Sequence, residues 1–289
     1  MHSSPILTLL SFLLTPLPHT ASSNFYEVLT PQPFQRAVDP NLLIPPTTIS
    51  PDPENIYYHF IDRTEKLLHQ NIRDNGYDTK LIEGNTGFMY EKALYLTRVL
   101  SNPAVTSYCE VGFNAGHSAF NALLSNENVV VTSFDIGVHK ERYLSASNDL
   151  LSAIFPRRLT LILGDSKVTI PNYLRDHPEL VCDVIFIDGG HDYETAKADI
   201  LNFQSAANKN ANILILDDTN LPEVALAMKD SVELGVITNG VDGLGGVNSR
   251  YCDEFSSVRV DNWMKLEPYN CVENQGGVLA VGSYNYHNK

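Results

Sequence analysis

The segment DVIFIDGGHDYETAKADI, residues 183–200, contains the pattern that decides the fold. Residues 183–187 form a short run rich in β-branched and aromatic side chains, which is typical of a buried strand. A turn of glycine and acidic residues follows at 188–192, and helical spacing begins at Tyr193. A strand that leads through such a turn into a helix is the repeating unit of a parallel α/β sheet.

The same unit recurs along most of the chain. Further strands are expected at residues 107–111, 129–134, 159–163, 213–216 and 277–281. Helices are expected at residues 56–72, 88–100, 118–124, 143–155, 170–175 and 193–208. Apolar strands that alternate with helices predict an open, mostly parallel sheet covered by helices on both faces. The ligands of such a sheet bind beyond the carboxyl ends of its strands.

The first 22 residues contain no Lys, Arg, Asp or Glu, and residues 6–17 form an apolar run too short to span a bilayer. Small residues at 21–23 offer a cleavage region, although no basic residue precedes the run. We expect a signal peptide at 1–22, a Pro-rich extension at 23–55 and one domain at 56–289. The expected location is the secretory pathway or the cell exterior. The alternatives are a weakly apolar tail and a cytoplasmic chain.

The composition is that of a folded protein with an acidic surface. Hydrophobic residues make up 43% of the chain and charged residues 19%, and the formal net charge is −14. Such a surface repels phosphate backbones and anionic membranes, so neither is an expected partner. Four cysteines are too few for a disulfide scaffold. Cys109 and Cys182 are interpreted as small buried hydrophobes, whereas Cys252 and Cys271 could pair in an oxidising compartment.

The predicted parallel strands end in acidic or glycine residues. The first runs into CEVGFNAGHSA, residues 109–119, where glycines allow a tight turn and close approach of a ligand. Later strands end at Asp135, Asp165, Asp188 and the pair at 217–218. A single acid of this kind is commonly a loop residue or a helix N-cap. Like charges gathered at one edge repel, however, and so favour a bound cation.

Five segments in this order resemble the class I S-adenosylmethionine-dependent methyltransferases: CEVGFNAGHSA, SFDIG, LILGDS, DVIFIDGGHDYETAKADI and ILILDDT. The likeness is closest to the metal-dependent O-methyltransferases of the catechol, caffeoyl-CoA and macrocin types. It implies a Rossmann-like α/β fold with a mostly parallel, seven-stranded sheet. Residues 258–263 and 277–284 would form the antiparallel, carboxyl-terminal end of that sheet. The implied cofactor is S-adenosyl-L-methionine.

The resemblance also implies the residues that bind this cofactor. Glu110 and the glycines of its turn would face the methionine end and the ribose, Asp135 the ribose hydroxyls, and Asp165 the adenine. The turn at 83–87 resembles the segment that closes over the methionine part. In chain order, the implied cofactor residues are Glu83, Thr86, Glu110, Gly112, Asn114, Gly116, Ser118, Asp135, Asp165, Ser166 and Asp188.

A divalent cation, Mg²⁺, is implied at Asp188, Asp217 and Asp218. Catechol-type enzymes carry Asp-Asn where this chain has Asp217-Asp218, which favours the macrocin type. His191 stands where catechol-type enzymes carry a lysine base and macrocin-type enzymes a histidine. We therefore assign His191 as the general base that deprotonates the acceptor hydroxyl. Considered alone, this histidine would be interpreted as a helix N-terminal residue that bonds its own loop.

The expected function is Mg²⁺-dependent transfer of a methyl group to a hydroxyl of a small acceptor, such as a sugar diol, a catechol or a glycoside. One alternative is a catalytically silent, secreted nucleoside-binding protein, because S-adenosylmethionine is made in the cytosol. Another is a nicotinamide-dependent oxidoreductase, which explains neither the DGGH segment nor the Asp217-Asp218 pair. The family often forms dimers, so a homodimer is a further expectation. The identity of the acceptor cannot be predicted from the chain.

Overall fold

The computed structural model describes residues 26–44, 52–82, 90–238, 247–249, 258–260 and 279–286. The expected signal peptide lies outside these residues, as do Glu83, Thr86, Cys252 and Cys271. The predictions that fall on them therefore stay predictions.

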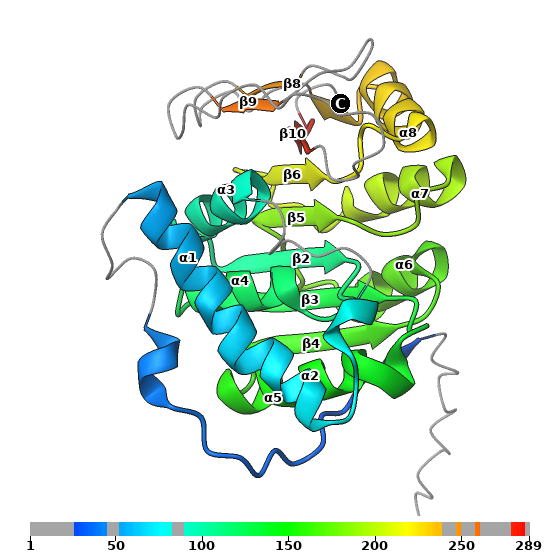
Figure 1. Cartoon of the computed structure of the whole chain (residues 1–289). Helices are drawn as coiled ribbons and strands as arrows, with labels where there is room; N and C mark the ends of the chain where they lie inside the picture. The colour runs from blue at the N-terminus through cyan, green and yellow to red at the C-terminus, as the bar shows by residue number, and fades with distance from the viewer. Residues whose placement is uncertain are drawn as a thin grey trace, which may run out of the picture.

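One open sheet forms the centre of the domain (Figure 1), with the strand order β1-β4-β3-β2-β5-β6-β10-β7. The bounds of its strands are β1 (Glu27–Val28), β2 (Ser107–Val111), β3 (Val130–Asp135), β4 (Leu159–Leu163), β5 (Val184–Ile187), β6 (Ile213–Leu216), β7 (Ile237–Thr238) and β10 (Ala280–Tyr284). Strands β2 to β6 are parallel, whereas β10 runs antiparallel to β6 and β7. Without the two-residue β1, the sheet has the seven strands, mostly parallel, that the sequence predicts.

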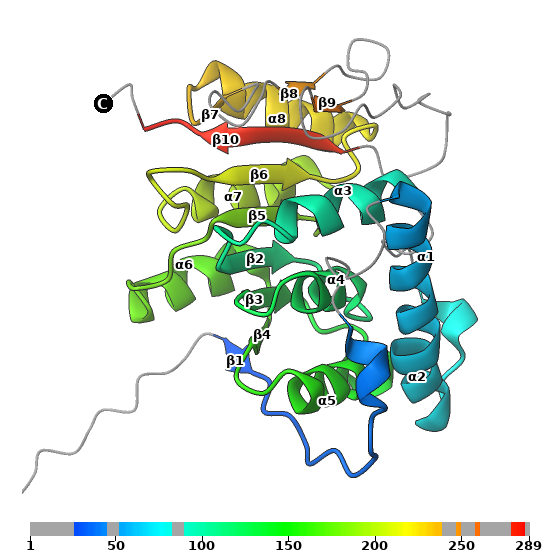
Figure 2. The same cartoon turned by 90° about the vertical axis from the view of Figure 1, so that its left-hand side faces the viewer.

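Helices cover both faces of this sheet (Figures 1 and 2). The helices before β4 are α1 (Pro53–Arg63), α2 (Gln70–Asp74), α3 (Tyr90–Leu100), α4 (His117–Ser125) and α5 (Ser145–Ile154). Those after β4 are α6 (Ser166–Asp176), α7 (Tyr193–Phe203) and α8 (Pro222–Glu233). Helix α3 packs on α4, and α7 packs on both α6 and α8. A π-helical segment, Thr64–His69, joins α1 to α2, so the helix expected at 56–72 is continuous in the structure.

The strands form because their apolar side chains are buried from both sides. All four residues of β5 are buried, and Ile185 and Phe186 are 0% exposed. Such two-sided burial explains why β5 (VIFI) and β6 (ILIL) are continuous apolar runs with no polar alternation. The core therefore lies on both faces of β2, β5 and β6, and the polar residues that follow these strands are held at the edge.

The segment 26–44 lies along the outside of the domain (Figure 2). Its strand β1 pairs antiparallel with β4, and the backbone N–H of Leu29 donates to Leu161 at 2.8 Å. Further along, the N–H of Gln32 donates to the carboxylate of Asp149 at 2.8 Å. Among the described residues, no helix is both long enough and apolar enough to cross a membrane.

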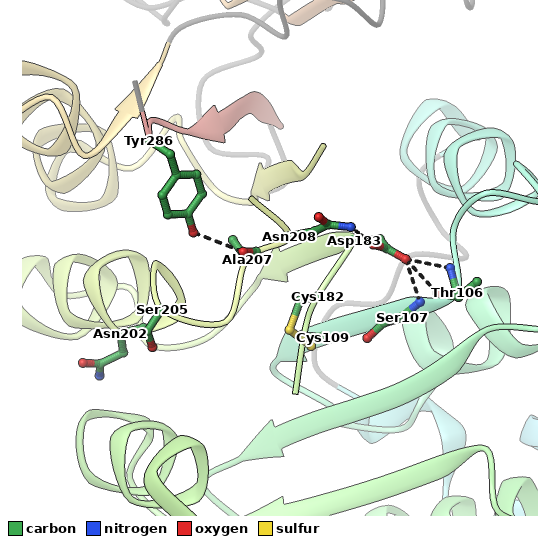
Figure 3. The surroundings of a disulfide bond; sticks show 10 residues. All are labelled: Thr106, Ser107, Cys109, Cys182, Asp183, Asn202, Ser205, Ala207, Asn208 and Tyr286. Carbon is green, nitrogen blue, oxygen red and sulfur yellow. Dashed lines mark hydrogen bonds between the residues drawn. A yellow bond between two sulfur atoms is a disulfide. The ribbon is translucent and has the colours of Figure 1, made fainter. Parts of the chain in front are cut away.

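Two sequence-based interpretations are wrong. Residues 258–260 do not join the antiparallel end of the main sheet, because β9 (Val258–Val260) pairs with β8 (Val247–Ser249) in a separate two-stranded sheet. Strand β10 is bonded on both sides, to β6 and β7, so it offers no free edge there. Cys109 and Cys182 are buried as expected, but they form a disulfide (Figure 3). The parallel pairing of β2 with β5 brings them together across 73 residues of sequence.

Candidate active site

The carboxyl ends of five parallel strands meet along one edge of the sheet. Val111 of β2 lies opposite Phe134 of β3 and Ile187 of β5, and Ile187 lies opposite Leu216 of β6. We call the turns that follow these strands the rim. The rim comprises residues 112–118, 135–137, 164–166, 188–192 and 217–219.

The glycine turn after β2 lies directly against the end of β5. Gly112 has φ +96°, and a Cβ atom at this position would lie 1.9 Å from the carbonyl oxygen of Asp188. Only glycine fits there. Gly116, with φ +82°, precedes α4, and Asn114 adopts the left-handed region at φ +50°, which asparagine tolerates better than most residues. The glycine turn that the resemblance assigns to the cofactor therefore lies directly against Asp188, the first of the three predicted metal ligands.

Asp135 is fixed between this turn and its own loop. The backbone N–H of Asn114 donates to its Oδ2 at 2.8 Å, and the N–H of Gly137 donates to its Oδ1 at 2.7 Å. The side chain of Asp135 thus has a defined direction at the end of β3. Its predicted contact with ribose stays a prediction.

Glu110 lies one residue inside the end of β2 and is 0% exposed. The hydroxyl of Ser133 donates to its Oε1 at 2.8 Å. Burial raises the pKa of Glu110 to about 7, against the effect of hydrogen bonds from Ser118 and Ser133. Since Ser118 is itself buried at the start of α4, three predicted cofactor residues, Glu110, Gly112 and Ser118, lie together where β2 meets the rim.

Asp165 and Ser166 begin α6. The Oδ1 of Asp165 accepts from the backbone N–H of Lys167 at 3.0 Å, so this acid caps the helix. Ser166 is buried. The capping role is sufficient to explain Asp165 without a ligand, and the predicted adenine contact stays a prediction.

Asp188, His191 and Asp218 form the centre of the rim. Each offers one ligand atom, and these atoms lie within 4.8 Å of one another. His191 Nε2 lies 2.9 Å from Asp218 Oδ2, and this hydrogen bond raises the pKa of His191 against the opposing effect of burial. Asp218 adopts φ +54°, a left-handed backbone that is uncommon for a residue with a side chain. The strand ends thus bring an imidazole and two carboxylates together.

Asp217, the third predicted metal ligand, faces a different partner. Its carboxylate contacts the ammonium of Lys92 from α3, and both side chains are almost fully buried. Lys92 Nζ also lies 3.7 Å from Asp188 Oδ2. Burial disfavours the charged form of Lys92, but the charges of Asp217 and Asp188 outweigh it and raise its pKa.

Lys92 is not among the site residues predicted from the sequence. The signal that could have indicated it is its place beside four apolar residues of α3, at 93–96, all of them buried. A lysine is almost never fully buried unless it is paired.

The donor set at the centre of the rim fits one divalent cation. Oxygen atoms of carboxylates are the ligands that Mg²⁺ prefers, and Asp188 and Asp218 present them from the ends of two adjacent strands. The acidic residues at this point of the structure lie at the edge of the sheet where ligands of open α/β folds bind. Among the described residues, Asp188, His191 and Asp218 form the group of potential ligands whose atoms are close enough to share an ion.

A family model described as a methyltransferase domain matches residues 109–219. This segment begins within β2, continues through β6 and contains every rim residue. No curated protein is similar enough to this chain to count as a match.

Solved structures share the fold at low sequence identity. A protein of Staphylococcus aureus assigned as a caffeoyl-CoA O-methyltransferase is 13% identical, with a TM-score of 0.50 over 79% of this chain and 99% of that one. The S-adenosylhomocysteine-bound methyltransferase PaMTH1 of Podospora anserina is 12% identical, with a TM-score of 0.50 over 82% and 99%. The O-methyltransferase TomG of Streptomyces achromogenes, solved with S-adenosylmethionine, is 11% identical, with a TM-score of 0.50 over 76% and 89%.

Proposed function

We propose that this chain, whose residues 109–219 match a methyltransferase domain, is an S-adenosylmethionine-dependent enzyme that transfers the methyl group to a hydroxyl of a small acceptor bound beside Asp188 and Asp218. A single observation carries the proposal. The glycine turn packs against Asp188 through Gly112, and Asp188 in turn shares a cluster of potential ligand atoms with His191 and Asp218. The predicted cofactor turn and the cluster therefore lie side by side.

A divalent cation held by Asp188 and Asp218 would supply a Lewis acid that orients the acceptor oxygens and lowers the pKa of the hydroxyl. The acidic pair at the strand ends supports Mg²⁺ for this role. Acceptors with adjacent oxygens suit such a site, and sugar diols, catechols and glycosides belong to this class.

His191 would take the proton. Its Nε2 is bonded to Asp218, which orients the ring and leaves Nδ1 as the atom that receives the hydroxyl proton. The acceptor oxygen then forms a bond to the methyl carbon while the bond from that carbon to sulfur breaks, and the electron pair remains on sulfur. The products are the methyl ether, S-adenosylhomocysteine and protonated His191. This direct displacement needs the two reactants held in line more than it needs covalent help from the protein.

Calorimetric titration with S-adenosylhomocysteine, with and without Mg²⁺, tests the cofactor. Binding in both conditions is the expected result, and no binding contradicts the proposal. A methyl-transfer assay on a panel of catechols and sugar diols then tests the chemistry. Activity should disappear in EDTA and in Asp188→Asn, and full activity in EDTA refutes the metal. Tight binding of the nucleoside without transfer to any acceptor favours the silent binding protein instead.

We also propose that the chain enters the secretory pathway. The disulfide between Cys109 and Cys182 supports this location, because disulfides persist in oxidising compartments and are rare in the cytosol. Alkylation of the unfolded protein before and after reduction, followed by mass spectrometry of the peptides, counts the thiols. Protected Cys109 and Cys182 in protein from its native source support export, and free thiols at both positions contradict it.

A further inference from the structure

Lys92 brings a positive charge into the acidic part of the rim. Its side chain is 6% exposed, and the side chain of Asp217 beside it is 1% exposed. The lysine stem runs through the core from α3, and Nζ lies 5.8 Å from the centre of the Phe186 ring. The carboxylate of Asp188 is 3.7 Å from the same ammonium. One buried cation therefore faces two of the three carboxylates that the sequence assigns to a metal.

We propose that Lys92 is a positioning residue that holds Asp217 as its own counter-ion, so that Asp188 and Asp218 alone supply the carboxylates for the divalent cation. The inference rests on the cation site of the proposed function and changes the set of residues that bind it.

The contacts of Asp217 support this division. Its Oδ1 accepts from the backbone N–H of Asp218 at 2.9 Å, and its Oδ2 contacts the ammonium of Lys92. Both oxygens are thus engaged by the protein. Asp188 and Asp218, in contrast, present atoms to the cluster that His191 completes, and Asp217 is not part of that cluster.

The charges lead to the same conclusion. Three carboxylates and one ammonium carry a net charge of minus two, which a single divalent cation neutralises. Without Lys92 the net charge would be minus three, and the carboxylate of Asp217 would be buried without a counter-ion, which is strongly unfavourable. The lysine thus matches the charge of the site to one divalent cation while it fixes Asp217.

A double-mutant cycle on Mn²⁺ affinity tests the proposal, with free Mn²⁺ measured by electron paramagnetic resonance. Lys92→Met keeps the stem and removes the charge that repels a cation, so Mn²⁺ should bind about tenfold more tightly. Asp217→Asn leaves Lys92 to attract Asp188 alone, so Mn²⁺ should bind about tenfold more weakly. The double variant restores the net charge of minus two, and its affinity should return to within about threefold of the wild type.

The double variant gives a different result if Asp217 is a direct ligand of the cation. If Asp217 binds the ion, removing the charge of Lys92 does not replace the lost ligand, so the affinity of the double variant stays far below that of the wild type, and this result overturns the inference. Weaker Mn²⁺ binding by Lys92→Met also overturns it. Asp218→Asn is the matched control, because adding Lys92→Met should not restore its lost affinity to the wild-type value. If Lys92→Met does not fold alone, the charge-balanced double variant compared with Asp217→Asn carries the test.

The wild-type protein separates this inference from the proposed function. No Mn²⁺ binding by the wild type overturns the cation site and this inference together. Binding by the wild type without rescue in the double variant overturns only the assignment of Asp217 to Lys92.

Discussion

The two ends of the sheet treat their carboxylates in opposite ways. Next to the disulfide, before β5, Asp183 is satisfied by neutral donors (Figure 3). Its Oδ2 accepts from the backbone N–H and the hydroxyl of Thr106 at 2.8 and 3.0 Å, and from the N–H of Ser107 at 3.2 Å. Its Oδ1 accepts from the amide of Asn208 at 2.7 Å. This carboxylate joins β2, β5 and the loop after α7, so its role is stability.

At the other end of the same strands, the rim gathers several charges within a small volume. Asp188, Asp217 and Asp218 lie near one ammonium and one imidazole, and Asp218 has left-handed backbone. The carboxylate that joins the strands at one end is therefore saturated by neutral donors, whereas the carboxylates of the rim are concentrated beside charged partners, and one of them, Asp218, has an uncommon backbone conformation.

The largest expected effect of a single substitution is on turnover at the rim. His191→Ala should lower the rate of methyl transfer by about 10²- to 10⁴-fold, because it removes the proposed general base. The dissociation constant of S-adenosylhomocysteine should stay within about twofold, since the histidine acts on the acceptor. Transfer rates measured at saturating cofactor, beside calorimetry, provide the two readouts.

His177→Ala is the matched control, because this histidine follows the carboxyl end of α6, away from the rim, where it contacts Tyr173 and the exposed Glu179. It should leave the rate unchanged. Equal rates in His191→Ala and the wild type would remove the assigned role.

The disulfide is the largest single contribution expected at the stable end. In the chain-entropy account, a cross-link across 73 residues restricts the unfolded chain and stabilises the fold by about 4 kcal/mol. The variant Cys109→Ala/Cys182→Ala should lose an amount of this order in urea unfolding, while its affinity for S-adenosylhomocysteine is retained. A loss below about 1 kcal/mol would show that the burial of these side chains, and not the bond, holds β2 to β5.

The disulfide also shows where prediction from sequence stops. The bounds of β2, β4 and β6 agree with the expected ranges, because each strand is a short apolar run that local pattern identifies. The pairing of Cys109 with Cys182 depends on which strands are neighbours, and nothing in either local segment specifies that β2 lies beside β5. Helix α8 was not predicted, since its apolar residues are interrupted by charged ones along 222–233.

The candidate site also has a part that could be predicted from the sequence and a part that could not. The proximity of Asp188, His191 and Asp218 could be predicted, because the strand ends of a parallel sheet meet at one edge. The ion pair of Lys92 and Asp217 could not be predicted, because it joins α3 to the end of β6 across much of the chain. Whether Asp217 faces an ion or a lysine is decided by packing between distant segments.

Substitutions at two glycines with similar φ angles distinguish the cost of backbone strain from the cost of a steric clash. Gly76 has φ +84°, and a Cβ atom added there would meet no other atom within 4 Å, whereas a Cβ at Gly112 meets the Asp188 backbone. Gly76→Ala should lower the free energy of unfolding by about 1 kcal/mol through backbone strain alone. Gly112→Ala should cost about 3 kcal/mol and also weaken binding of S-adenosylhomocysteine, because the turn must move from Asp188. Equal costs in chemical denaturation, with unchanged binding, would contradict the close approach of the turn to β5.

The last prediction concerns a buried acid of α7, Asp199, whose effect on stability depends on pH. Asp199 is 0% exposed, and a Cβ on Gly189 would lie 3.1 Å from its Oδ2. Burial raises the pKa of Asp199 to about 7. In the unfolded chain the same carboxyl ionises near pH 4, so between about pH 4 and 7 the folded state binds the extra proton. This group therefore makes the fold less stable as the pH rises through that window, by about 2 kcal/mol between pH 5 and pH 7.

Asp199→Asn removes the ionisation and should be more stable than the wild type near neutral pH, with an advantage that shrinks as the pH falls to 5. Urea unfolding of both proteins across this range measures the difference. Glu194→Gln, on the exposed first turn of the same helix, is the control and should show no such gain. An advantage of Asp199→Asn that is equal at pH 5 and pH 7 would mean that the carboxyl is already paired as an ion. Asp199 would then resemble Asp183, a carboxylate whose charge the fold stabilises with its own donors. The contrast between the two ends of the sheet would in that case apply only to the residues that directly precede or follow the strands.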